Sequence, residues 1–170
     1  VGSVIYTAML TPSGGIRCDL AIIRTSDQRF LVMTGGSTGA YDLSWLTSHA
    51  QEWPDMQIND VSGDLCWIGL WGPKSREILS ALTSDDVSNE AFPYLSTADL
   101  TVGDIPVLAV RISYVGELGW ELYCPTEHGS PFWDILWEAA TPHGAVVAGT
   151  TAQDSLRLEK GYRLWGADIH

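Results

Sequence analysis

The sequence has few basic residues and no long apolar run. Nine lysines and arginines stand against 21 aspartates and glutamates, which gives a formal net charge of −12. Phosphate backbones and anionic lipids are bound by clustered positive charge, so we expect no nucleic-acid partner and no membrane partner. The apolar runs are shorter than the roughly 20 residues of a membrane span, and no signal-peptide pattern opens the chain. We therefore expect a cytoplasmic protein, or a mitochondrial-matrix protein in a eukaryote.

Cysteine is also scarce. Cys18, Cys66 and Cys124 form no pair with metal-ligand spacing, and no histidine stands at motif distance from them. We expect buried thiols in a reducing compartment and no metal site. The four histidines are scattered and belong to no Ser/His/Asp or Cys/His signature, so nucleophilic catalysis has little support.

What the chain does have is enough apolar material for a core. Its 170 residues are 45% hydrophobic and include eight tryptophans, which indicates large packed aromatic contacts. Turn signals and alternation over residues 1–63 predict an antiparallel strand meander followed by a helix. Residues 64–170 predict a plait-like, ferredoxin-like unit with a last strand at 145–148 and a capping box at 150–153. The expected fold class is α+β with two units.

Residues 114–122, with the sequence YVGELGWEL, are the most informative stretch. A Val- and Ile-rich strand pattern precedes them, and two glycines permit a tight reversal into a second strand. On that second strand Glu121 alternates with apolar neighbours. A carboxylate there must find hydrogen-bond donors, since removing an unpaired charge from water is costly. The alternative is an edge strand with Glu121 facing solvent, and the pattern leaves both open.

Asp19 is the other candidate carboxylate. It follows a Gly-Gly turn and lies among apolar residues in a predicted strand. A carboxylate there can accept a proton or stabilise a positive charge in a pocket; the alternative is an Asp that faces solvent. Judged from residue type alone, Tyr6 and Tyr114 are core or rim aromatics. Arg157, on the last predicted helix, is a surface charge by the same standard.

Four ordered motifs resemble the aminomethyltransferase family, which includes the glycine-cleavage T protein and the folate-binding halves of dimethylglycine and sarcosine dehydrogenases or oxidases. Residues 6–20 resemble its YTxxLNxxGGIxxDL segment, and Gly72-Pro73 resembles its QGP turn. Residues 114–122 resemble its YTGExGxEL hairpin, and residues 157–168 its RLExGxxLxGxD helix end. Together these motifs cover nearly the whole chain in the family's order.

The resemblance implies that the chain is the middle portion of a folate-binding domain. Such a domain transfers a one-carbon unit from an amine or iminium to tetrahydrofolate, giving 5,10-methylenetetrahydrofolate. Asp19 matches the family's essential acid, and Glu121 matches the carboxylate that pairs with the pterin amino and ring N–H edge. Tyr114 matches an aromatic pocket residue, Tyr6 is expected to act likewise, and Arg157 matches an arginine near the folate.

The resemblance also bears on the parent protein. Cys18 stands where T proteins commonly have a second Asp, and the helix end is closer to the flavin-dependent enzymes. We therefore expect a fragment of a dimethylglycine or sarcosine dehydrogenase or oxidase, with FAD on a domain outside these residues and a methylated amine as the one-carbon source. The fragment alone is expected to be inactive. Two alternatives share the motifs: a non-catalytic regulatory or packing domain, and a folate-dependent demethylase of another methylated substrate.

Overall fold

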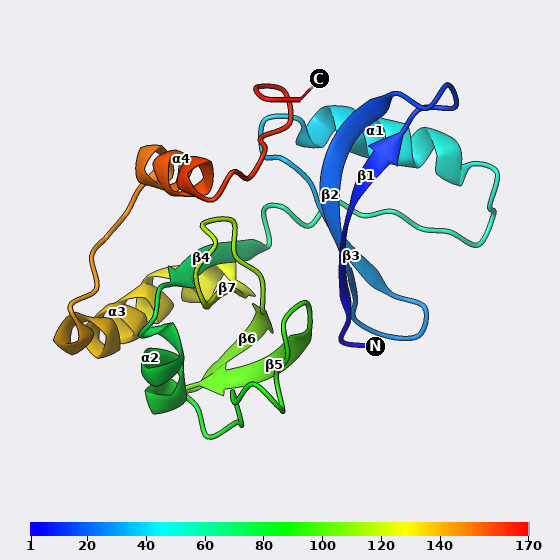
Figure 1. Cartoon of the computed structure of the whole chain (residues 1–170). Helices are drawn as coiled ribbons and strands as arrows, with labels where there is room; N and C mark the ends of the chain where they lie inside the picture. Colours follow the sequence, from blue (N-terminus) through cyan, green and yellow to red (C-terminus); the bar gives the residue numbers. More distant parts are fainter. Residues whose placement is uncertain (170) are drawn as a thin grey trace. The chain divides into compact units, whose positions relative to one another are not determined.

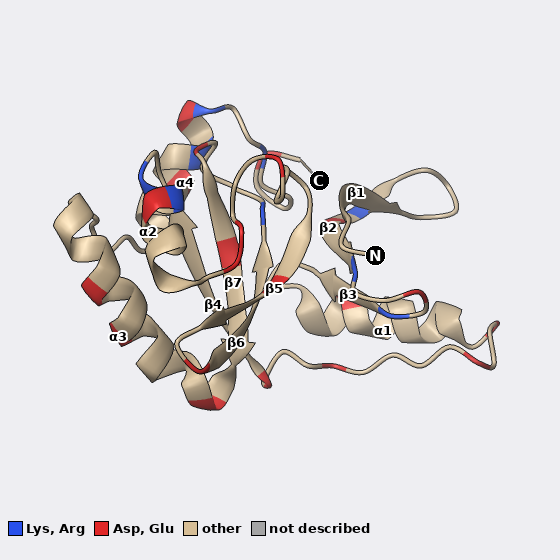
Figure 2. Cartoon of the chain, turned by 90° about the horizontal axis from the view of Figure 1, so that it is seen from below, with Lys and Arg blue, Asp and Glu red and all other residues tan. Residues whose placement is uncertain are grey.

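The computed structural model describes residues 1–169, so His170 lies outside the described residues. The chain is a mixed α/β protein with antiparallel sheets (Figure 1). It divides into two compact units, built mainly from residues 3–63 with 164–169 and from residues 64–163. Figure 2 shows that acidic positions occur in helices, strands and loops of both units. The net negative charge is therefore not confined to one segment.

The first unit contains a sheet of order β1-β2-β3 and one helix. Gly14, with φ of +84°, serves the turn between β1 and β2, a backbone conformation that glycine adopts at little cost. In the β1–β2 register Ala8 lies opposite Asp19. The bounds are β1 Val4–Leu10, β2 Ile16–Arg24, β3 Phe30–Met33 and α1 Gly39–Ala50.

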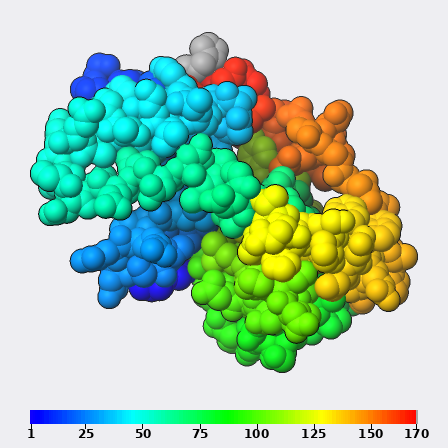
Figure 3. Space-filling view, turned by 180° about the vertical axis from the view of Figure 1, so that it is seen from behind, coloured from blue at the N-terminus to red at the C-terminus, as the bar shows by residue number. Residues whose placement is uncertain are grey.

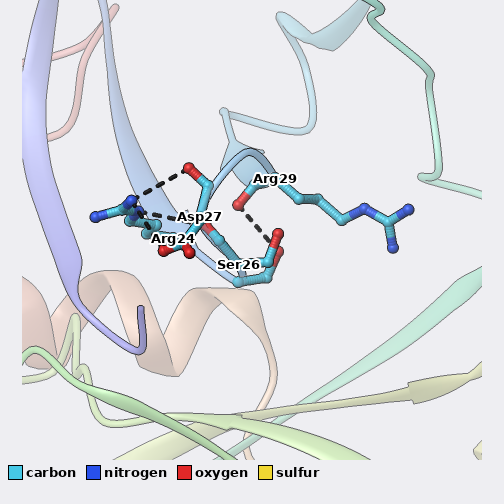
Figure 4. Close-up of polar contacts among 5 residues, drawn as sticks. Arg24, Ser26, Asp27 and Arg29 are labelled. Atoms are coloured by element: carbon cyan, nitrogen blue, oxygen red, sulfur yellow. Dashed lines mark hydrogen bonds and ion pairs between the residues drawn. The ribbon is translucent and has the colours of Figure 1, made fainter.

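Figure 4 shows the polar contacts that close the turn between β2 and β3. Arg24 Nη2 donates to the Asp27 carbonyl at 3.1 Å and to Asp27 Oδ1 at 3.3 Å. The Ser26 amide donates to the Arg29 carbonyl at 3.2 Å. The turn expected between these two strands is therefore stabilised by local bonds, as short turns rich in Ser and Asp commonly are.

The second unit contains an antiparallel sheet of order β4-β7-β6-β5, with β4 and β5 at its edges. Helices α2 and α3 pack on one face of this sheet around a core that includes Trp120, Leu122 and Phe132, all 0% exposed. Figure 3 shows α3, in the yellow-to-orange part of the colour scale, at the surface of this unit. The bounds are β4 Leu65–Trp71, α2 Ser75–Leu82, β5 Thr97–Val102, β6 Ile105–Val110, β7 Gly119–Pro125, α3 Gly129–Ala140 and α4 Thr150–Glu159.

The structure differs from the sequence-based expectation over residues 145–153. Residues 145–149 form no strand, and Val146 and Val147 are 81% and 64% exposed. Apolar composition alone does not make a strand, because the backbone also needs a hydrogen-bonded neighbour. The expected capping box is wrong as well, since Gly149 is the N-cap of α4 and makes no side-chain cap bond. Without the last strand, the ferredoxin-like arrangement is not confirmed.

Two of the cysteines are fully buried, on different sheets. Cys18 is 1% exposed and Cys124 is 0% exposed. Burial raises the pKa of each thiol to about 11, and Asp42 adds to the effect at Cys18 as Cys66 does at Cys124. Both thiols are therefore protonated in the folded chain at neutral pH.

Because of these two buried thiols, we expect the folded chain to lose stability in alkali. Above about pH 9 the unfolded chain loses their protons while the folded chain keeps them up to about pH 11. The folded state then binds more protons, so the free energy of unfolding falls as the pH rises, by up to ~1.4 kcal/mol per thiol per pH unit. Urea unfolding at a series of pH values measures the slope. Cys18→Ala with Cys124→Ala should flatten it, and an equal slope in that double variant would contradict the prediction.

Candidate functional site

The first unit has an open cavity of about 260 Å³ at the β1–β2 ladder. The Tyr6 hydroxyl donates a hydrogen bond to Asp19 Oδ2. Ala8 lies opposite Asp19 and Tyr6 lies opposite Ala21, so Tyr6 and Asp19 share one face of the ladder. The structure thus brings together two residues that the resemblance selects. The cavity is lined by Tyr6, Thr7, Ala8, Ile16, Asp19, Trp165 and Ile169.

The lining determines what this cavity can do chemically. Apart from Asp19, Tyr6 and Thr7, its walls are apolar side chains, including the Trp165 ring. A carboxylate beside apolar walls interacts more strongly with a nearby positive charge or a proton than it would in water. Asp19 is therefore placed to stabilise a cation or accept a proton, with Tyr6 fixing one of its oxygens.

The second unit carries the other candidate carboxylate, Glu121, on an interior strand. β7 lies between β4 and β6, which excludes the edge-strand alternative. Glu121 Oε2 accepts a hydrogen bond from the Tyr123 hydroxyl at 2.7 Å, and the carboxyl also accepts one from the Trp67 side chain. Burial raises the pKa of the Glu121 carboxyl, while these two hydrogen bonds oppose the rise. Glu121 has the donors that a carboxylate in a sheet requires.

Around Glu121, the face of the sheet opposite the helices is aromatic. Gly69 lies opposite Glu121 and Gly119 lies opposite Trp71. A Cβ added at Gly69 would come within 2.3 Å of the Trp71 ring, and one at Gly119 within 2.6 Å of it. The missing side chains therefore let Trp71 lie flat on the sheet. Its ring centroid is 5.9 Å from that of Trp67, so Glu121 lies beside a pair of indoles.

The hairpin motif and the helix-end motif meet within the second unit. Gly116, with φ of +71°, forms the bend before β7, and a Cβ there would lie 2.3 Å from Lys160 Cγ. Lys160 Nζ in turn pairs with Glu117 Oε1 at 3.1 Å. Glycine is needed at position 116 both for its backbone angle and for the space that the lysine stem occupies. Two motifs that are separate in sequence therefore form one junction.

Tyr114 and Arg157 both lie at this junction. The Tyr114 ring stacks on Tyr162 with centroids 6.2 Å apart, and its hydroxyl donates to the Arg163 carbonyl at 2.8 Å. Arg157 is 4% exposed; it binds Asp154 Oδ1 at 2.7 Å and the Tyr162 carbonyl at 2.9 Å. These contacts show Arg157 ordering the end of α4, so its expected place beside folate stays a prediction.

Sequence reasoning missed three residues beside the two carboxylates. Tyr123 follows Glu121 by two positions, so strand alternation was a usable signal for it. Trp67 is far from Glu121 in sequence and meets it only through the β4–β7 register. Trp165 was noted within the helix-end motif, but its place in the Asp19 cavity comes from the fold of residues 164–169 back onto the first unit.

The described part of the chain contains neither a cluster of metal-ligating side chains nor a membrane-spanning helix. Among residues 1–169, no three His, Cys, Asp or Glu side chains gather in a way that would hold a metal ion. None of the helices over the same residues has the length and apolar content needed to cross a bilayer.

Several known proteins are similar to the chain. Human mitochondrial dimethylglycine dehydrogenase is 39% identical over 171 residues, covering 100% of the chain and 20% of that protein. An aminomethyltransferase of Chlorobium luteolum is 36% identical over 99% of the chain and 46% of its own length. The solved structure of aminomethyltransferase T from Bartonella henselae superposes with a TM-score of 0.83 at 24% identity, over 99% of the chain and 44% of that structure.

These relatives agree with the resemblance inferred from the motifs. The chain spans about a fifth of the length of the dehydrogenase and less than half of the transferase. The family model described as the GCVT N-terminal domain matches residues 1–170. The chain therefore belongs to the GCVT N-terminal domain family.

Proposed function

We propose that the chain is a tetrahydrofolate-binding, aminomethyltransferase-type domain that forms 5,10-methylenetetrahydrofolate. The observation that carries the proposal is Glu121, a partly buried carboxylate held by two donors on an aromatic sheet face. A flat heterocycle with adjacent N–H groups, such as the pterin ring, suits such a face because aromatic walls offer stacking and the carboxylate offers two acceptor oxygens.

In this proposal Glu121 binds the amino and ring N–H edge of the pterin. Two parallel N–H bonds to one carboxylate are strong and also fix the orientation of the ring. Tyr114 contributes aromatic contact, and Arg157 lies near the folate. The contacts of Tyr114 with Tyr162 and of Arg157 with Asp154 support a rigid junction from which these residues act.

Asp19 is the proposed catalytic residue. The one-carbon unit arrives as a methylene iminium, whose positive charge a nearby carboxylate stabilises. One folate nitrogen attacks the methylene carbon and loses its proton to that carboxylate. The second folate nitrogen then displaces the amine, which leaves with the proton. The apolar walls around Asp19 support this role, since they weaken the screening of its charge. The Tyr6 hydroxyl donates to one oxygen of Asp19, and a carboxylate has further acceptor capacity on its second oxygen.

We further propose that the one-carbon unit comes from dimethylglycine, sarcosine or a similar methylated amine, oxidised by an FAD domain elsewhere in the parent polypeptide. Relatives named dimethylglycine dehydrogenase and sarcosine dehydrogenase extend well beyond the matched region, which supports a multi-domain parent. The names of these relatives also place them in mitochondria, and we propose the same compartment for a eukaryotic source. The chain by itself is proposed to be inactive.

Glu121→Gln tests the folate assignment. We expect tetrahydrofolate to bind the full-length variant about 100-fold more weakly. The amide lacks the negative charge that strengthens the two N–H bonds to the carboxylate, and its NH₂ group would face one of the ligand's N–H donors. Isothermal titration calorimetry at neutral pH measures the change. The matched control is Asp104→Asn, at an exposed carboxylate in the turn between β5 and β6, which should bind as the wild type does.

The outcomes separate the candidate functions. Equal affinity in Glu121→Gln and wild type would remove Glu121 from the folate site, and no binding by the wild type would end the proposal. Binding without formation of 5,10-methylenetetrahydrofolate from any methylated amine would favour the non-catalytic domain.

A further inference from the structure

Tyr123 is the donor that lies nearest to Glu121 along β7. The two residues are separated by one position and so share a face of the sheet, where the Tyr123 hydroxyl donates to Glu121 Oε2 at 2.7 Å. Tyr123 also lies opposite Trp67 in the β4–β7 register, and the Trp67 side chain hydrogen-bonds the same carboxyl. Glu121 is thus held between donors from its own strand and from the neighbouring strand.

We propose that Tyr123, together with Trp67, is a positioning residue that keeps Glu121 ionised and oriented for a ligand's N–H edge. The inference rests on the proposed function, because it names the residues that prepare Glu121 for that ligand. The motif YVGELGWEL ends at Leu122, so Tyr123 lies just outside the pattern that identified the site.

The need for such donors follows from the burial of Glu121. Burial raises the pKa of this carboxyl, and a protonated carboxyl presents its own O–H to the incoming N–H groups instead of a second acceptor. The hydrogen bonds from Tyr123 and Trp67 act in the opposite direction because they stabilise the charged form. Losing either donor should therefore make Glu121 easier to protonate.

Other charged groups do not replace these donors. The residues that face Glu121 from β4 and β6 are Gly69 and Val110. Asp99 is exposed on β5, two strands away, and a second carboxylate would favour the protonated form of Glu121. Among residues 1–169 no lysine, arginine or histidine contributes to the pKa of Glu121. The stabilisation of its charge thus comes from neutral donors.

Both donors keep their protons across the working range of pH. Burial and the neighbouring Glu121 charge raise the pKa of the Tyr123 phenol well above its ordinary value. The Trp67 indole N–H is a donor only and does not titrate. Of these three side chains, only Glu121 should therefore titrate in the pH range over which ligand binding is measured.

Tyr123→Phe in the full-length protein tests the proposal. As the pH is lowered, the variant should lose tetrahydrofolate affinity at a pH about one unit higher than the wild type does. Within that window of about one pH unit the variant should bind about tenfold more weakly. Well above the window the affinities should converge to within a fewfold. Tyr94→Phe removes the hydroxyl of an exposed tyrosine in the same unit and should leave the profile unchanged.

A second measurement makes the test independent of folate. The side-chain carboxyl ¹³C resonance of Glu121, assigned by its loss in Glu121→Gln, is titrated in the wild type and in Tyr123→Phe. A higher pKa in Tyr123→Phe supports the proposal, and an equal pKa overturns it even where the chain binds no folate. Wild-type folate binding with identical pH profiles in the two proteins would overturn it while leaving the proposed function intact.

Discussion

Asp19→Asn is expected to lower kcat for the formation of 5,10-methylenetetrahydrofolate by about 10²- to 10⁴-fold, the range that one acid–base or electrostatic group usually contributes. The side chain keeps its shape but loses the charge that would stabilise an iminium and the basicity that would take up a proton. Tetrahydrofolate affinity should change only a fewfold. Rapid-quench assay of the full-length protein with a methylated amine separates kcat from binding.

The control for this variant is Asp27→Asn. Asp27 lies in the turn after β2 in the same unit, and its side chain is 90% exposed and paired with Arg24. The same chemical change there should leave kcat unaltered, since exposed ion pairs of this kind contribute little. Full activity in Asp19→Asn would show that the carboxylate in the cavity has no part in the transfer.

Gly119→Ala should produce the largest loss of stability of any single methyl addition to the hairpin. A Cβ at position 119 would lie 2.2 Å from the Leu70 carbonyl oxygen and 2.8 Å from the Trp71 Cα, and neither backbone atom gives way easily. The β4–β7 pair would have to separate where Trp71 lies flat on the sheet. We expect a loss of about 3 kcal/mol in the free energy of unfolding, at the upper end of overpacking costs.

Urea unfolding followed by tryptophan fluorescence measures this loss. The matched control is Gly63→Ala, because a Cβ at Gly63 meets no heavy atom within 4 Å. The control should stay within about 0.5 kcal/mol of the wild type. A Gly119→Ala variant as stable as Gly63→Ala would mean that the close approach of the β4 backbone to Gly119 is wrong.

Most strand positions were predictable because their sequence signals are local. Alternation placed Asp19 and Glu121 in strands, and turn residues marked the reversals around them. The sequence did not predict which strand would lie at an edge, because strand order depends on contacts between distant segments. Residues 145–148 show the same limit, since their valines have strand propensity but no hydrogen-bonding neighbour within the described residues.

The two candidate sites differ in how far the sequence led to them. Tyr6 and Asp19 were both selected by the motif. They lie on consecutive strands, and the β1–β2 register brings them together. Glu121 was selected too, but the donors that make it suitable come from Tyr123 and Trp67. Arg157 was selected for a ligand; its described contacts hold the end of α4, and its place beside a ligand stays a prediction.

The sequence by itself determined the family, the two carboxylates and most of the strands, because motif order and period-two alternation are properties of neighbouring residues. The tertiary structure decided that Glu121 lies on an interior strand, that Trp71 covers two glycines and that Lys160 fills the space over Gly116. These features depend on strand register and on close packing between segments far apart in the chain, and such contacts leave no periodic signal in either segment alone.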